Sequence, residues 1–116
     1  MDKIAVFVGV DYHKDAVQVC VLNREGKLLG NRSCVNDPAV VREFVGKHGE
    51  VQGVVLESCE GAADFAEALI GTSGWSVHLA HPGYVHRLRQ NPDKTDYSDA
   101  RLLADLERVG YVPRVW

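Results

Sequence analysis

Four carboxylate side chains occupy positions from which a folded chain could bring them to one place. Asp11 and Glu57 each end an apolar run of the kind that forms a buried strand. The carboxyl ends of such strands line the crevice where α/β sheets place ligand chemistry. Asp96 and Asp99 are three residues apart, so a helix would present both on one face. Together these acids predict one carboxylate cluster.

Such a cluster requires a cation. Like charges in a partly desolvated site repel one another at a cost of roughly several kcal/mol unless a positive ion offsets them. Carboxylate oxygens suit hard divalent cations, Mg²⁺ or Mn²⁺. Two such ions about 3.5–4 Å apart can stabilise the attacking and the leaving oxygen of a phosphodiester. Taken singly, each acid has an equally good structural explanation, because acids are common in turns and in the first turn of a helix.

Three residues close to these acids are further candidates. His13 and Lys14 directly follow Asp11 and could contact a substrate or activate water, although turn residues are usually only solvated. Glu60 competes with Glu57 for the second position of the cluster. We prefer Glu57 because it directly ends the apolar run, whereas Glu60 suits the first turn of the helix that follows.

The elements that must position these residues follow from the spacing of apolar side chains. Strands are expected at residues 4–11, 16–22, 27–35, 51–57 and 75–80. Helices are expected at residues 38–48, 61–70 (ended by Gly71), around 85–88, and at 96–109. The short turns between the first three strands make them antiparallel neighbours, and later strands return by right-handed crossovers. The order β-β-β-α-β-α-β-α predicts an α/β, ribonuclease-H-like fold with a mixed five-stranded sheet, an opening shared with actin-like kinases and ATPases.

Composition sets the limits of these hypotheses. At 116 residues the chain is long enough for one domain, and 46% hydrophobic with 25% charged residues is typical of a globular protein. No apolar run reaches about 18 residues, so we expect no membrane span and a cytoplasmic location. Three widely spaced cysteines indicate neither disulfides nor a zinc site, and Cys20 and Cys34 fit a core.

Charge gives a mixed indication about nucleic acid. The formal net charge of −3 argues mildly against a nucleic-acid partner. Residues 81–101 have a net charge of +1, however, and would contact phosphates if a metal neutralised the adjacent acids. The candidate phosphate contacts are Lys94, Arg87, Arg89, Arg101 and Lys14. Tyr84 and Tyr97 could stack on bases, although packing explains them equally well.

Four segments together resemble a known family: Val8-Gly9-Val10-Asp11, Leu56-Glu57-Ser58, His81-Pro82, and Lys94-Thr95-Asp96-Tyr97-Ser98-Asp99-Ala100. They are similar to the N-terminal domain of the DEDD transposases of the insertion-sequence-110 family, which includes the pilin-gene invertases. The resemblance covers nearly the whole chain. It implies a RuvC-like domain in which Asp11, Glu57, Asp96 and Asp99 bind Mg²⁺ during DNA strand cleavage and rejoining.

The resemblance also implies features beyond this domain. Residues 1–109 would form the catalytic domain, and residues 110–116 would begin the linker to a second domain that carries a nucleophilic serine. The full-length protein would act on DNA as a homo-oligomer, and some family members are guided by a structured bridge RNA.

Two other functions stay open at this level. One is a fragment of an actin-like phosphotransferase, but the turn at residues 12–15 lacks the glycine that lets backbone amides approach a phosphate. The other is a noncatalytic nucleic-acid-binding module that keeps the fold.

Overall fold

A mixed five-stranded sheet forms the central layer of the computed structural model, which describes residues 3–82 and 95–110. Its strands are β1 (Ala5–Tyr12), β2 (Ala16–Asn23), β3 (Leu28–Val35), β4 (Glu50–Glu57) and β5 (Val77–Ala80). They lie in the order β3-β2-β1-β4-β5. The first three strands are antiparallel neighbours, whereas β4 runs parallel to β1 and β5 runs parallel to β4. The carboxyl ends of the central strands β1 and β4 therefore meet at one edge.

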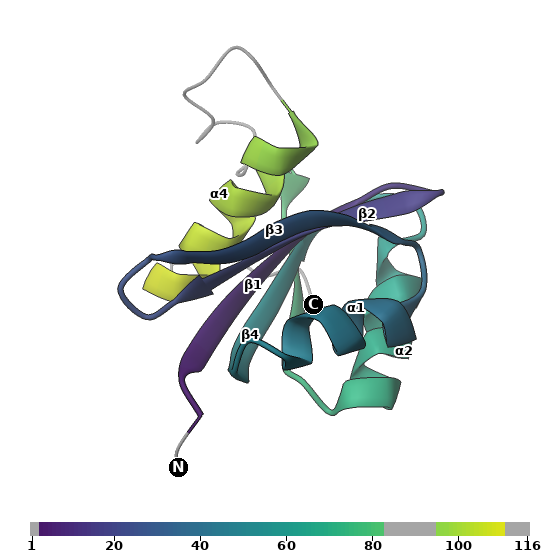
Figure 1. The fold of residues 1–116 in the computed structure, drawn as a ribbon. Helices are drawn as coiled ribbons and strands as arrows, with labels where there is room; N and C mark the ends of the chain where they lie inside the picture. The colour runs from purple at the N-terminus through teal and green to yellow at the C-terminus, as the bar shows by residue number, and fades with distance from the viewer. Residues whose placement is uncertain (1–2, 83–94, 111–116) are drawn as a thin grey trace.

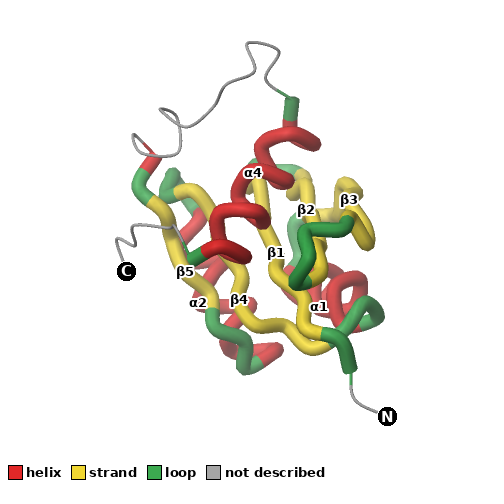
Figure 2. Tube along the Cα trace, turned by 90° about the vertical axis from the view of Figure 1, so that its left-hand side faces the viewer, coloured by secondary structure: helices red, strands yellow, loops and turns green. Residues whose placement is uncertain are grey.

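The described helices cover both faces of this sheet (Figure 1). They are α1 (Pro38–Gly46), α2 (Ala62–Ser73) and α4 (Asp96–Val109). The helices α1 and α2 pack on one face, and α4 is the one helix among the described residues that crosses the other face, as Figure 2 shows. The chain thus has the expected β-β-β-α-β-α-β-α order. None of the described helices is long and apolar enough to cross a membrane.

The alternation of side chains along β1 explains the two unequal faces. Val6, Val8 and Val10 point to the α1 and α2 side and belong to the large apolar core. On the opposite side, α4 packs through small residues such as Ala100 and Ala104. Because the strand alternates with a period of two, Asp11 emerges on the side of α4.

Gly9 allows the close approach of α4 to β1. A Cβ atom at this position would collide with the backbone of Ala100 and Ala104. Glycine in a strand interior often marks such a close backbone approach. The glycine therefore sets the depth at which α4, and with it Asp96 and Asp99, lies over the end of β1.

The boundary predicted for the second helix is wrong at its C-terminal end. The helix α2 continues through Gly71 to Ser73, and Gly74 ends it with a left-handed φ of 74°. Glycine inside a helix costs only about 1 kcal/mol, and the Ser73 hydroxyl donates to the Leu69 carbonyl at 2.5 Å. The fifth strand is correspondingly shorter than expected, because it begins at Val77.

Several expectations concern residues outside the described part of the chain. They are the short helix around 85–88, all of the linker predicted at 110–116 except Gly110, and Tyr84, Arg87, Arg89 and Lys94.

Candidate metal centre

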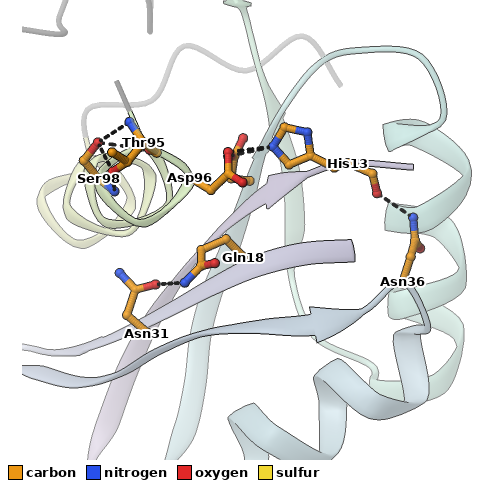
Figure 3. Close-up of polar contacts among 8 residues, drawn as sticks. His13, Gln18, Asn31, Asn36, Thr95, Asp96 and Ser98 are labelled. Carbon is orange, nitrogen blue, oxygen red and sulfur yellow. Dashed lines mark hydrogen bonds and ion pairs between the residues drawn. The ribbon is translucent and has the colours of Figure 1, made fainter. Parts of the chain in front are cut away.

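Two of the predicted acids meet at a histidine. The Nε2 atom of His13 lies 3.0 Å from Oδ2 of Asp11 and 3.0 Å from Oδ1 of Asp96. Figure 3 shows the ring of His13 directed at Asp96. Within the described residues, these three side chains form the group whose ligand atoms, all within 4.8 Å of one another, could hold a metal ion. The fold thus joins residues 85 positions apart in the sequence.

Hydrogen bonds from Asn36 fix the turn that carries His13. The Asn36 side-chain amide donates to the backbone carbonyls of His13 at 2.8 Å and Lys14 at 3.0 Å. Asn36 immediately precedes Asp37, the N-cap of α1. The loop between β1 and β2 is therefore attached to the start of α1, which limits the positions that the His13 ring can take.

The N-terminus of α4, which carries Asp96, is also fixed by polar contacts. The Thr95 hydroxyl accepts from the backbone amide of Ser98 at 3.0 Å, and the Ser98 hydroxyl accepts from the backbone amide of Thr95 at 3.2 Å, which makes a capping box. Gln18 donates to Asn31 at 2.8 Å, and Asn31 donates to the carbonyl of Tyr97 at 3.1 Å. These two bonds, the first of which is drawn in Figure 3, connect the helix to β2 and β3.

The electrostatics of the site favour a positive ion. The pKa of Asp11 is raised from 3.8 to about 6. Burial is the main cause and the nearby acids Asp96 and Asp99 add to it, whereas the hydrogen bond to His13 and its charge act in the opposite direction. Burial lowers the pKa of His13, but the hydrogen bond to Asp11 and the charges of Asp11 and Asp96 outweigh this effect and raise it. The carboxylate of Asp11 is thus costly to ionise where it stands, and a cation would remove that cost.

The other two predicted ligands lie close by. Asp99 is 3% exposed, on the face of α4 that packs on the sheet. Its charge raises the pKa of Asp11. Glu57 ends β4 directly after Leu56, the register partner of Val10, so it stands beside Asp11 at the same sheet edge. Neither belongs to the three-residue group. The tetrad as a set of ligands therefore stays a prediction.

The thiol of Cys59 lies within the electrostatic influence of both Glu57 and Asp11. Burial, then the charges of Glu57 and Asp11, raise the pKa of Cys59, so one thiol senses both carboxylates. The competing acid Glu60 lies exposed in the turn just before Gly61, the N-cap of α2. Cys20 and Cys34 are buried, as expected for core thiols.

Two candidate phosphate contacts are described, and both are exposed. Lys14 lies in the turn next to His13, and Arg101 lies on α4. Of the residues considered from sequence, His13 is the one whose interpretation the structure changes most, because its ring contacts both Asp11 and Asp96. The i, i+2 spacing from Asp11 hints at the first contact, but no local pattern indicates the second contact, with Asp96.

Comparison with known proteins agrees with this arrangement. A family model described as a transposase, the DEDD type of insertion sequence 110, matches residues 8–114. RuvC of T. thermophilus, solved in complex with a Holliday junction substrate, is similar with a TM-score of 0.55 and 18% sequence identity, over 96% of this chain and 99% of that chain. No curated protein sequence matches the chain. The structural likeness confirms the ribonuclease-H-like, RuvC-like fold.

Proposed function

Because the chain belongs to the DEDD transposase family of the insertion-sequence-110 type, we propose that it cleaves and rejoins DNA strands through a divalent-cation site at the end of β1. The observation that carries the proposal is the meeting of Asp11 and Asp96 at one imidazole nitrogen, 3.0 Å from each.

The donor set fits a divalent cation. Asp11, Asp96 and the neighbouring Asp99 and Glu57 supply carboxylate oxygens, the ligands that Mg²⁺ and Mn²⁺ prefer. A bound cation would neutralise charge developing on the phosphodiester and lower the pKa of a bound water. The raised pKa of Asp11 supports this reading, because the fold places a carboxylate where water stabilises it poorly and leaves that role to a positive partner.

The substrate that we propose is DNA. The similar RuvC structure contains a Holliday junction, and DNA is the molecule on which a transposase acts. Lys14, in the turn after β1, and Arg101, on α4, are both exposed, and we propose them as contacts to DNA phosphates. The net charge of −3 does not oppose this role, since four of the sixteen acids would be covered by cations.

Two rival functions are less well supported. An actin-like phosphotransferase would need backbone amides around a phosphate in the turn after β1. Here the carbonyls of His13 and Lys14 are held by Asn36, and the side chain of His13 faces the acids. A noncatalytic module would not require a desolvated carboxylate at Asp11. The bridge RNA, the homo-oligomer and the serine-bearing second domain stay predictions.

The test is strand exchange by the protein that contains this chain, on DNA carrying the ends of its element, with Mg²⁺ or Mn²⁺ added. We expect Asp11→Asn and Asp96→Asn to reduce the rate by about a thousandfold or more. Glu57→Gln should do the same. The matched control is Glu60→Gln, which removes the same charge three residues away and should leave the rate unchanged.

Thermal unfolding of each variant checks that the domain stays folded. Full activity of the Asp11 and Asp96 variants would refute the cation site. If Glu60→Gln is inactive and Glu57→Gln is active, then Glu60, and not Glu57, is the glutamate of the cation site.

A further inference from the structure

We propose that His13 is itself a ligand of the cation, and that its nitrogen makes the site select Mn²⁺ over Mg²⁺. The inference rests on the proposed function for the presence of a cation at Asp11 and Asp96. It adds a ligand that the acidic tetrad does not contain, and it predicts which metal the site takes.

The distances between the three ligand atoms suit direct coordination. Neighbouring ligands of a six-coordinate cation with bonds of about 2.1 Å lie about 3.0 Å apart, and opposite ligands lie about 4.2 Å apart. The Nε2 atom of His13 is 3.0 Å from an oxygen of Asp11 and 3.0 Å from an oxygen of Asp96. All three atoms lie within 4.8 Å of one another. An ion could therefore replace the shared hydrogen with little movement of the ring.

The surroundings of the ring leave room for such an ion. The side chains of His13 and Asp96 are 53% and 59% exposed, so the open side of the site can supply water as further ligands. The backbone of His13 is held by Asn36, and Asp11 is held in β1. Two of the three donors are thus positioned before any ion arrives, which reduces the entropy lost on binding.

The choice of metal follows from the nature of the donors. Mg²⁺ is bound almost entirely through oxygen ligands and keeps several waters. Imidazole nitrogen suits first-row transition ions, whereas carboxylates suit both Mg²⁺ and Mn²⁺. A site with two carboxylates and one imidazole therefore gains affinity for Mn²⁺ that it does not gain for Mg²⁺. Without His13 the site would bind through oxygen alone and would lose this preference.

The first measurement is pulsed electron paramagnetic resonance of Mn²⁺ added to the 116-residue chain. We expect a nitrogen coupling from a directly bound imidazole, lost in His13→Gln. Glutamine can still donate to both carboxylates and so keeps the acids in place without supplying an imidazole. His48→Ala is the matched control, because His48 packs on Phe44 of α1, on the face opposite α4, and should leave the coupling intact.

The second measurement is calorimetric titration with Mn²⁺ and with Mg²⁺. His13→Gln should lower the ratio of the two affinities about tenfold, mainly by weakening Mn²⁺. Asp96→Asn should weaken both ions. Thermal unfolding shows whether each variant is folded under the conditions of the titration.

The outcomes separate this inference from the proposed function. If Asp96→Asn abolishes Mn²⁺ binding but wild type shows no nitrogen coupling and His13→Gln keeps the affinity ratio, His13 is not a ligand and the cation site stands. If Asp11→Asn and Asp96→Asn leave Mn²⁺ binding unchanged, the cation site itself is wrong, and the inference fails with it.

Discussion

The helix α4 has an acid–histidine contact at each end, and the two contacts differ in their access to solvent. At the N-terminal end, His13 and Asp96 are 53% and 59% exposed and 3.0 Å apart. At the C-terminal end, His78 and Glu107 are 15% and 7% exposed and 3.6 Å apart. The same residue types thus stand in an open site and in a closed one.

The closed contact is part of the packing of the helix. Glu107 lies over Gly53 of β4, where a Cβ atom would collide with its carboxylate. His78 also contacts the Ser76 hydroxyl at 3.0 Å. Near the same end, Arg108 donates to Asp105 at 2.7 Å and to the carbonyl of Arg24 at 3.3 Å. Such a contact holds α4 on the sheet, whereas the open contact can exchange its hydrogen for a cation or a substrate.

The substitution with the largest expected effect on both ends is Gly9→Ala. The added methyl group would displace α4 from β1 and lower the free energy of unfolding by about 3 kcal/mol. Because Asp96 moves with the helix, Mn²⁺ affinity should fall as well. Urea unfolding and metal titration measure the two effects. Gly71→Ala is the control: a Cβ there meets nothing within 4 Å, so it should be neutral or stabilise by up to about 1 kcal/mol.

Loss of the acid should affect stability at the closed end and metal affinity at the open end. Glu107→Ala removes a buried carboxylate from His78 and should lower the free energy of unfolding by about 2 kcal/mol with little change in metal affinity. Asp96→Asn should change stability by less than about 0.5 kcal/mol and weaken the binding of both Mn²⁺ and Mg²⁺. Equal stability losses in the two variants would remove the distinction between a packing contact and an exchangeable one.

The acids and the histidine at the open end should also make the free energy of unfolding depend on pH. The pKa of Asp11 is about 6 in the folded chain and 3.8 in the unfolded chain, so the folded chain binds this proton more tightly. The resulting contribution to the free energy of unfolding is complete below about pH 4 and is lost as the pH rises through about 6. His13, whose pKa is also raised, acts in the same direction. Asp11→Asn should therefore stabilise the metal-free chain by about 1–2 kcal/mol at pH 8, after allowance for solvent screening.

The measurement is urea unfolding of wild type and Asp11→Asn at pH 4 and pH 8, without metal. The stability advantage of the variant should be small at pH 4. An advantage that does not grow with pH would show that ionised Asp11 is not costly in the fold. Added Mn²⁺ should stabilise only the wild type at pH 8.

A local effect on stability is expected at the cap of α4. Thr95→Ala removes the hydroxyl that accepts from the amide of Ser98 and should cost about 1 kcal/mol. The loss should fray the first turn, which carries Asp96, and leave the contact of Glu107 intact. Amide hydrogen exchange along α4 would show faster exchange at residues 96–99 alone; a uniform increase would mean that the helix opens as one unit.

Much of this fold could be predicted from residue patterns. Alternating valines in β1 and β2 and the Asp37-Pro38 start of α1 are local signals, and these strands and this helix form where the signals stand. The Thr95 cap of α4 was found only in the structure. The stop predicted at Gly71 fails because a helix interior tolerates glycine when packing continues, and a later glycine with positive φ is available.

The candidate site divides in the same way. The sequence by itself determined that Asp11 and Glu57 end buried strands and that Asp96 and Asp99 share a helix face, since strand and helix periods are properties of neighbouring residues. Only the tertiary structure decided that His13 stands between Asp11 and Asp96, and that Asp96 is open while Asp99 is buried. Those facts depend on how closely α4 approaches β1 over Gly9, and contacts between elements 85 residues apart leave no periodic trace in the sequence.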